Sequence, residues 1–472
     1  MSSGAGVATG VPPVSALLSL DDALAQLLQA AEPVRETQHL PTLDAHGRVL
    51  AHDLCSGINV PPEDNSERDG WALRVADWAP AANELAAAKE LAASAASAEA
   101  AAPSESAESA RLSSSDGSPS TGLRLPVSQR IPAGQAALPL APGSVARVFT
   151  GACIPHGADA VVMQEDADQN AQGVAFTQPI RLGQWIRRAG EDIRAGSVVL
   201  PAGLRLTPQA LGLAASVGTA QLEVRRRVRV ACFFTGDELV PPGQPLPAGA
   251  IYESNRFVLV NLLRRLGCEV NDFGLIADSL AATRAVLREA AVDADLIVSS
   301  GGMSVGEEDH VKPAVQAEGE LALWQVAMKP GKPLAFGAVR RAPADVGALP
   351  GGSGRGLAQT YFIGLPGNPV SSFVTFLIAV RPFILRLQGV REVAPRALRL
   401  QAHFDWPKPD RRREFLRASI DAEGGLQLFP NQGPGVLSST VGSDGLIDCP
   451  AGCAIARGDW VRFLPFDALL NG

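Results

Sequence analysis

The stretch RVRVACFFTGDEL, residues 227–239, decides the fold because it begins a regular alternation of strand-like and helix-like segments. Its first eight residues are rich in β-branched and aromatic side chains, and residues 253–266 then have the pattern of a helix. Strands that alternate with helices predict a mainly parallel α/β sheet that is covered on both faces. The alternation continues with strands at 269–276, 293–300 and 361–365 and with helices at 279–291 and 370–387.

Outside this block the chain is richer in β-like runs. Ser19 and Asp22, three residues apart, precede Leu24, Leu27 and Leu28 and predict a capped amphipathic helix. Short runs separated by Gly and Pro at 40–58 and 123–221 predict a β-rich half, and similar runs after about residue 395 predict a small β-domain. A chain of 472 residues has room for three or four such domains.

Two stretches have the composition of irregular chain. Residues 79–122 contain 16 Ala and 10 Ser without an aromatic residue, which predicts a low-complexity insertion, either disordered or a loose surface helix. Because added loop length has little effect on stability, we expect that this insertion can be deleted without loss of activity. A Gly-rich stretch at 348–356 is expected to be a flexible loop between two strands.

Composition excludes several classes of protein. The chain is 46% hydrophobic and 19% charged, as in globular proteins, and its formal net charge of −8 does not favour a nucleic-acid surface. Arg381 interrupts the longest apolar run, at 373–380, so we expect no membrane span. No Lys or Arg precedes Arg35, as a secretory signal would require, so we expect a cytoplasmic protein. Six scattered cysteines without a CxxC pair support neither a disulfide framework nor a zinc site.

Three loops that follow predicted strands carry the polar residues of a binding site. They are TGDEL with Asp237 and Glu238, GGMSVGEEDH at 301–310, and LPGNPVSS at 365–372. Each loop alone is ordinary turn or cap chemistry, but parallel strands bring their following loops to one sheet edge. Gly turns and helix N-termini suit phosphate, whereas carboxylates suit Mg²⁺, so the combination predicts a site for a metal-bridged phosphate ester.

Charged residues elsewhere could contribute to the same chemistry. Lys312 and the lysines of MKPGKP, Lys329 and Lys332, could neutralise phosphate or simply be solvated. Asp64 and Asp69 in PPEDNSERDGWALR could bind a metal or act as acid and base, although turn carboxylates are often merely exposed. The segment RRAGEDIRAG (187–196) could be an anion clamp or an ion-pair cluster.

Eight motifs in order make the chain resemble the MoeA/gephyrin E-domain family of molybdopterin molybdenumtransferases. They are DNSERDGWALR, VFTGACIPHGADAVVMQED, IRRAGEDIRAGSVV, TGDELVPPGQPL, IYESNR, SSGGMSVGEEDHVK, MKPGKPLAFG and GLPGNPVSS. The resemblance implies a multidomain α/β plus β fold. It has an elongated helical and β domain (14–60 and 181–226), a β-rich domain (61–180), a molybdopterin-binding α/β domain (227–392) and a C-terminal barrel-like β-domain (393–472).

The activity implied by the resemblance uses adenylylated molybdopterin and molybdate as substrates. Molybdenum is placed on the dithiolene sulfurs, and AMP leaves with help from Mg²⁺ as cofactor. The resemblance also implies a homodimer that receives its substrate from a molybdopterin adenylyltransferase and passes its product to chaperones of molybdenum enzymes. Molybdate and tungstate have nearly the same size and charge, so the sequence is compatible with either.

The motifs also carry over the family's site residues. The implied catalytic acids are Asp64, Asp69, Glu191, Asp237 and Glu238, of which Asp64, Glu191 and Asp237 would bind the metal. Because these acids are far apart in the chain, we expect the site at a domain or subunit junction. The implied substrate-binding residues are Ser300, Gly301, Gly302, Ser304, Asp309, Lys312, Lys329, Pro330, Lys332, Pro333, Pro366, Gly367, Asn368 and Pro369.

The chain departs from the family pattern at six positions, and two other functions compete. Glu63, Glu67, Arg68 and Trp71 replace the Phe, Ala, Met and Tyr of PFDNSAMDGYA, Glu253 replaces the Asp of IYDSN, and His310 replaces a Tyr. One alternative is a non-catalytic molybdopterin-binding or scaffolding protein, against which the retained acids argue. The other is an adenylylating enzyme, which would resemble only residues 227–389.

Overall fold

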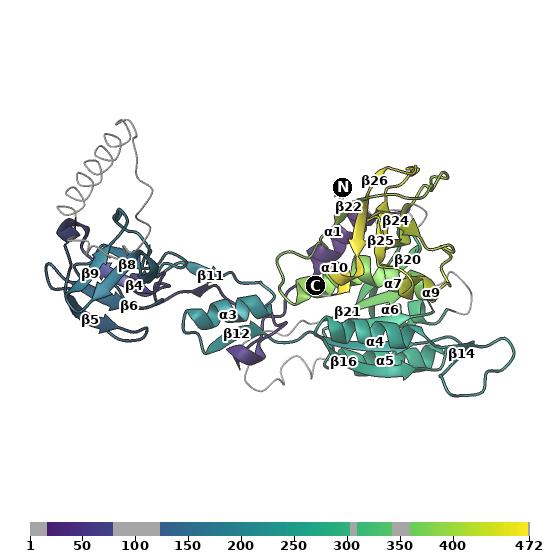
Figure 1. The fold of residues 1–472 in the computed structure, drawn as a ribbon. Coiled ribbons are helices and arrows are strands. Elements are labelled where there is room, and N and C mark those ends of the chain that lie inside the picture. Colours follow the sequence, from purple (N-terminus) through teal and green to yellow (C-terminus); the bar gives the residue numbers. More distant parts are fainter. Residues whose placement is uncertain (1–16, 79–122, 303–308, 342–358, 471–472) are drawn as a thin grey trace, which may run out of the picture. The chain divides into compact units, whose positions relative to one another are not determined.

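The computed structural model describes residues 17–78, 123–302, 309–341 and 359–470 (Figure 1). The chain divides into two compact units. The large unit comprises Met1–Asp53, Pro201–Leu211 and Ala220–Gly472, and the small unit comprises Leu54–Leu200 and Gly212–Thr219. The predicted insertion at 79–122 and the Gly-rich stretch at 348–356 lie outside the described residues. The four predicted domain boundaries stay a prediction.

The large unit contains a six-stranded sheet in the order β16-β13-β17-β21-β20-β18. The first four strands run parallel, and β20 and β18 join antiparallel, so the prediction of a mainly parallel sheet is confirmed. The strands are β13 (Arg229–Phe234), β16 (Glu269–Leu275), β17 (Leu296–Ser300), β18 (Gly319–Gln325), β20 (Pro333–Arg340) and β21 (Gln359–Leu365).

Helices cover both faces of this sheet (Figure 1). Successive strand residues point to opposite faces, so Val230, Cys232 and Phe234 pack in one core cluster, whereas Ala231 and Phe233 pack in another. The first cluster includes residues of α1, α4, α7 and α8, and the second includes α5 and α6. The helices are α1 (Leu20–Ala30), α4 (Asn255–Arg265), α5 (Leu280–Ala291), α6 (Val311–Glu318), α7 (Pro369–Thr375) and α8 (Arg381–Leu387).

The helix α1 begins where the sequence predicts. The Ser19 hydroxyl accepts a hydrogen bond from the Asp22 amide at 3.1 Å, which satisfies one of the free amides of the first turn. Leu27 is fully buried, and Leu24 and Leu28 pack against the same core. The capped amphipathic helix is therefore confirmed.

A π-helical turn, Phe376–Val380, joins α7 to α8 into one helical stretch. Pro369–Leu387 is long and apolar enough to cross a membrane, but 94% of it is buried inside the protein. Arg381 within it is only 2% exposed and donates to the carbonyl oxygens of Val393 at 3.1 Å and Ala468 at 3.3 Å. Burial lowers the pKa of this guanidinium to about 10.

The C-terminal domain is a curved antiparallel sheet in the order β23-β25-β26-β22, with β24 and β19 pairing on the other side of β23. A bridge between Ala402, just after β22, and Leu426 in β24 brings the two ends together, so the predicted barrel-like form is confirmed. The elements are β19 (Met328–Lys329), β22 (Leu398–Gln401), β23 (Arg413–Ile420), β24 (Leu426–Leu428), β25 (Gly445–Cys449), β26 (Trp460–Pro465), α9 (Ser438–Val441) and α10 (Phe466–Leu470).

The small unit is built from short strands, as the sequence predicts. Its main sheet has the order β5-β6-β4-β7, and three two-stranded ladders, β3-β10, β2-β11 and β8-β9, accompany it. The strands are β2 (Leu54–Cys55), β3 (Asn65–Ser66), β4 (Gly70–Leu73), β5 (Val127–Ile131), β6 (Val145–Val148), β7 (Ala160–Met163), β8 (Ala167–Asn170), β9 (Gly173–Phe176), β10 (Ile186–Arg187) and β11 (Val198–Leu200).

Three further pieces complete the description. β1 (Thr37–Pro41) pairs antiparallel with β12 (Gln221–Arg225), close in sequence to α3 (Pro208–Ser216). β14 (Leu239–Val240) and β15 (Ile251–Tyr252) pair between β13 and α4.

Candidate functional site

Three strands of the large unit end side by side. Phe234 of β13 pairs with Ser300 of β17, and Ser300 pairs with Leu365 of β21, so their following loops leave the same sheet edge. The backbones approach closely there: a Cβ on Gly301 would lie 2.1 Å from the Thr235 carbonyl oxygen. The predicted convergence of the three loops is confirmed.

Hydrogen bonds between neutral groups join two of these loops to α4. The Ser300 hydroxyl donates to the Pro366 carbonyl at 2.9 Å. The Asn255 amide group donates to the Ser300 hydroxyl at 2.9 Å and to the Gly367 carbonyl at 2.7 Å. Asn255 lies in the motif IYESNR, but it was not predicted as a site residue, because its hydrogen-bond partners are 45 and 112 residues away in the sequence. We call Asn255, Ser300 and Gly367 the neutral junction.

Two carboxylates at this edge have buried oxygen atoms without a partner among the described residues. Asp309 accepts a hydrogen bond from the Val311 amide at 3.3 Å through Oδ1, whereas its Oδ2 has no partner. Burial, with a smaller effect of the Asp278 carboxylate, raises the pKa of Asp309 to about 6. Asp278 Oδ1 is also buried without a partner. Asp278 was missed, although it follows β16 as an acid at the same edge.

The other predicted residues of these loops lie as follows. Asp237 and Glu238 are exposed just after β13. Gly302 is close-packed, since a Cβ there would lie 2.5 Å from the Val311 side chain, and Lys312 is exposed in the first turn of α6. Ser304 lies outside the described residues. These side chains place exposed carboxylates and a lysine along the sheet edge.

The start of α7 differs from the expected anion site. Asn368 precedes the helix, Pro369 has no amide hydrogen, and the next amide, of Val370, donates to the Pro434 carbonyl at 3.0 Å. An anion would therefore have to displace a backbone hydrogen bond to reach that amide.

The MKPGKP segment packs on α7 and lines a pocket. A Cβ on Gly331 would lie 2.3 Å from the Thr375 hydroxyl, so this turn lies directly on the helix. Lys332 is exposed, and Pro333 begins β20. Lys329 lies 2.8 Å from a carboxylate oxygen of Glu414 and 3.3 Å from Asp410. These carboxylates raise the pKa of Lys329, which is an ion-paired and partly exposed cation.

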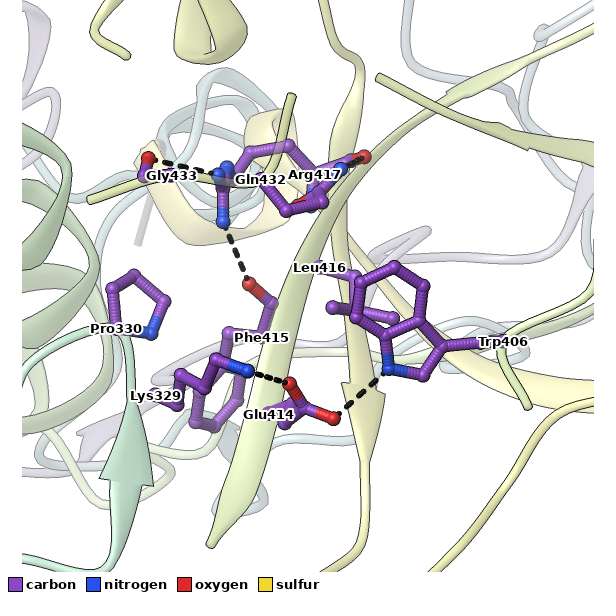
Figure 2. Close-up of a pocket in the computed structure, with 9 residues that line it drawn as sticks. All are labelled: Lys329, Pro330, Trp406, Glu414, Phe415, Leu416, Arg417, Gln432 and Gly433. Atoms are coloured by element: carbon purple, nitrogen blue, oxygen red, sulfur yellow. Dashed lines mark hydrogen bonds and ion pairs between the residues drawn. The ribbon is translucent and has the colours of Figure 1, made fainter. Parts of the chain in front are cut away.

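Figure 2 shows the pocket, of about 260 Å³, on whose wall Lys329 and Glu414 meet. Trp406 donates a hydrogen bond to Glu414 Oε2 at 2.9 Å, whereas Lys329 lies beside Oε1, so both oxygens of this nearly buried carboxylate have a partner. The pocket is lined by Lys329, Pro330, Trp406, Glu414, Phe415, Leu416, Arg417, Gln432 and Gly433.

Arg417 is the unusual member of this lining. It is 1% exposed, and among the described residues it donates only to neutral acceptors, which are the Ser439 hydroxyl at 3.1 Å and the carbonyls of Gly433 and Phe415 at 3.2 and 3.4 Å. Burial lowers its pKa to about 10, so it remains a cation at neutral pH. A buried cation without a carboxylate partner favours an anionic ligand. Arg417 was not predicted as a site residue, because nothing in its strand sequence REFLRASI distinguishes it from an ordinary strand arginine.

The predicted acids of the small unit are held by two separate sets of contacts. Asp64 accepts from Arg188 at 2.6 Å and from the Ala189 amide at 2.8 Å, and the Arg188 amide in turn donates to Glu191 at 3.0 Å. Asp69 Oδ1 accepts from the Thr150 amide at 2.7 Å and the Thr150 hydroxyl at 2.8 Å, and these bonds lower the pKa of Asp69. Thr150 was not selected from the sequence.

The predicted metal ligands are therefore only partly assembled within either unit. Asp64 and Glu191 share Arg188 in the small unit, whereas Asp237 belongs to the large unit. Across the described ranges, the one group of three acid or His side chains with ligand atoms within 4.8 Å of one another is His403, Asp421 and Glu423 in the C-terminal domain. Exposed or unpartnered carboxylate oxygens at Asp237, Asp278 and Asp309 fit the donor preference of Mg²⁺.

Two of the departures from the family pattern are buried. Trp71 lies in β4 with the Arg147 guanidinium 5.0 Å from its ring centroid. Glu253 is 4% exposed and accepts from the Arg256 amide at 2.7 Å, and burial raises its pKa. Both substitutions are therefore accommodated in the protein interior.

Comparison with known proteins agrees with this architecture over the whole chain. Three family models match: MoeA N-terminal region (domain I and II) at residues 18–218, Probable molybdopterin binding domain at 231–386, and MoeA C-terminal region (domain IV) at 399–466. A molybdopterin molybdenumtransferase of Haemophilus influenzae is 35% identical, with 96% of this chain and all of that protein covered. Molybdopterin molybdenumtransferase 2 of Mycobacterium tuberculosis is 34% identical, with 90% and 93% covered.

Solved structures show the same fold. A molybdopterin biosynthesis MoeA protein from Pyrococcus horikoshii superposes with a TM-score of 0.70 at 26% identity, covering 96% of this chain and 99% of that one. The three matching models and the full-length relatives together show that this chain belongs to the MoeA family.

Proposed function

We propose that the protein is a molybdopterin molybdenumtransferase, which inserts molybdenum from molybdate into adenylylated molybdopterin and releases AMP. The full-length relatives in Haemophilus influenzae and Mycobacterium tuberculosis carry this name. The observation that carries the proposal is the sheet edge, where close-packed glycines and the neutral junction meet two carboxylates, Asp278 and Asp309, each with one buried oxygen that has no partner among the described residues. At such an edge, backbone amides can bind the phosphate of a ligand, and carboxylates can bind the cation that accompanies it.

Each group at the edge has a separate task in this proposal. The amides at Gly301 and Gly302 and the cations Lys312 and Lys332 bind the phosphate and pterin part of the substrate. In the large unit, Asp309 and Asp278 together with Asp237 would hold Mg²⁺, and in the small unit Asp64 and Glu191 remain proposed metal ligands. When bound, Mg²⁺ supplies positive charge that stabilises the leaving phosphate oxygen of AMP.

The pocket around Arg417 is the second half of the proposal. Molybdate is a small tetrahedral dianion, and the cavity is lined by the buried cation Arg417 and by the Lys329–Glu414 ion pair. We expect molybdate to bind there by charge-assisted hydrogen bonds. Arg417→Met should raise the KM for molybdate about a hundredfold, whereas Arg399→Met, at an exposed β22 arginine, should leave it unchanged. An unaltered KM in Arg417→Met would place molybdate elsewhere.

The remaining parts of the proposal rest on the family. We propose a cytoplasmic homodimer that takes its substrate from a molybdopterin adenylyltransferase and delivers its product to chaperones of molybdenum enzymes. Sedimentation of the purified chain tests the dimer, and a monomeric enzyme with full turnover would contradict it.

The decisive experiment is AMP release from adenylylated molybdopterin by the purified protein. Release should need both Mg²⁺ and an oxyanion, and titrating molybdate against tungstate tells which of the two is preferred. Asp237→Asn should reduce release at least a hundredfold, because a metal ligand is lost. Glu289→Gln, which removes an exposed acid of α5 outside the site loops, should not. Tight substrate binding without release would instead favour a scaffold.

A further inference from the structure

An arginine and a tryptophan form an exposed stack in the acidic loop of the small unit. The Arg68 guanidinium carbon lies 4.7 Å from the centroid of the Trp185 ring. Arg68 is exposed, and in the described part of the chain no carboxylate lies within ion-pair distance of it. Trp185 is half-buried and packs against a buried cluster that includes Ile131 and Ile186. The guanidinium therefore has one face on the indole ring and one face open to solvent.

The backbone fixes this stack with some strain. Trp185 is the one non-glycine residue with a positive φ, of 54°, in the described ranges. A bulky side chain in this conformation costs about 1–3 kcal/mol and persists only where neighbours hold it. The holding contacts are visible: the Glu67 amide donates to the Trp185 carbonyl at 3.0 Å, and the next residue, Ile186, pairs with Ser66. Ser66 also fixes Arg68, through its hydroxyl, which donates to the Arg68 carbonyl at 2.6 Å.

The stack lies in the chain between two acids of the proposed site. Asp64 precedes the β3-β10 ladder and Asp69 follows Arg68 directly, so the same short loop presents both acids and the stack. The outer face of a guanidinium stacks well on a planar heterocycle, and its N–H groups remain free for phosphate. Of the proposed ligands, an adenylyl group has both a planar base and a phosphate.

We propose that Arg68, supported by Trp185, is a specificity-determining platform on which the adenine of the adenylyl group stacks. This inference rests on the proposed function, because it assigns a binding residue to the nucleotide half of that substrate. It gives a role to one of the departures from the family pattern, at a position where the usual Met cannot supply a planar cation.

Titration calorimetry with AMP and with ribose 5-phosphate, on the full chain with Mg²⁺, tests the platform. Wild type should bind AMP about tenfold more tightly than ribose 5-phosphate, because only AMP has a base to stack. Arg68→Lys keeps the positive charge but removes the planar guanidinium. It should therefore weaken the affinity for AMP about tenfold, while changing the affinity for ribose 5-phosphate less than about twofold. Arg68→Met should weaken both ligands. Arg399→Lys, at an exposed arginine of β22, is the matched control and should change neither.

Each contrary outcome is informative. Equal weakening of both ligands in Arg68→Lys would make Arg68 a phosphate contact and overturn the stacking, as would wild-type binding that does not distinguish the ligands. A wild type that turns over with Mg²⁺ and molybdate, while Arg68→Lys leaves AMP affinity unchanged, would refute the platform and leave the proposed function standing. If AMP binding depends on the base and on Arg68 but the protein shows no turnover, the platform stands and the proposed function is refuted.

Discussion

At the carboxyl edge of the α/β sheet, glycine backbones in close contact and hydrogen bonds between neutral groups hold the loops, whereas in the small unit ion pairs and charged hydrogen bonds hold the acidic loop. Gly301 has no space for a side chain, and Asn255 joins two loops at once. Asp64, in contrast, is fixed by the half-exposed Arg188. Packing tolerates little change and solvated charge tolerates more, which fits the three charged departures from the family pattern in the acidic loop, at Glu63, Glu67 and Arg68.

The sharpest way to break this comparison is to add one methyl group at the sheet edge. Gly301→Ala should lower the free energy of unfolding by about 3 kcal/mol or more, because Cβ would lie 2.1 Å from a carbonyl oxygen and φ is +95°. Gly243→Ala is the control: its φ is +91°, but no atom lies within 4 Å of the added Cβ, so it introduces backbone strain without a steric clash. It should lower the free energy of unfolding by only about 1 kcal/mol. Thermal unfolding measures both, and equal losses would show that collision does not matter.

The next largest effect is expected at the neutral junction. Asn255→Ala removes two hydrogen bonds between loops and should lower the free energy of unfolding by about 2 kcal/mol. Denaturant unfolding measures the change. Asn261→Ala removes one exposed hydrogen bond, to the Phe257 carbonyl on the same helix, and should lose less than about 0.5 kcal/mol. If the two variants are equally stable, the junction does not hold the loops.

In the acidic loop, function and stability should separate. Asp64→Asn should change the free energy of unfolding by less than about 1 kcal/mol, because its partner Arg188 is 56% exposed. AMP release should nevertheless fall at least tenfold, because a proposed metal ligand becomes neutral. Asp168→Asn, which breaks a pair with Arg124 in the same unit, should spare turnover. An unfolded Asp64→Asn protein would contradict the contrast drawn above.

The smallest effect concerns pH. The folded-state pKa of Asp309, about 6, lies above its unfolded value, so the folded protein binds the extra proton. Stability should therefore fall as pH rises from about 4 to about 6, by on the order of 1 kcal/mol after allowance for solvent screening at this half-exposed carboxyl. Comparing thermal unfolding of wild type and Asp309→Asn over this range isolates the effect. Identical slopes would mean that Asp309 is not perturbed by burial.

Much of the fold could be predicted because its signals are local. Strand-like runs that alternate with helix-like segments located the four parallel strands of the α/β sheet, and Ser19 with Asp22 located a helix start. The three loops were found because they follow strands, and parallel strands share an edge.

The missed residues depend on contacts that sequence spacing does not show. Asn255 binds groups up to 112 residues away, and Thr150 holds Asp69 from 81 residues away. Arg417 lies in a run that was predicted only as a strand, and its burial involves the backbone around Gly433, later in the chain. The expectation of free amides at α7 was reasonable from its sequence, but the carbonyl that occupies one of them belongs to Pro434.

Arg381 has a consequence for the chain before it folds. In the finished protein this cation lies inside the 19-residue apolar helix and is hydrogen bonded to two carbonyls. In the nascent chain the same stretch has the length and hydropathy of a bilayer span. An arginine three residues from the middle makes partition into lipid less favourable by about 2.5–3.5 kcal/mol. The same cation thus disfavours insertion of the unfolded helix into lipid, whereas in the folded core its N–H groups are hydrogen bonded.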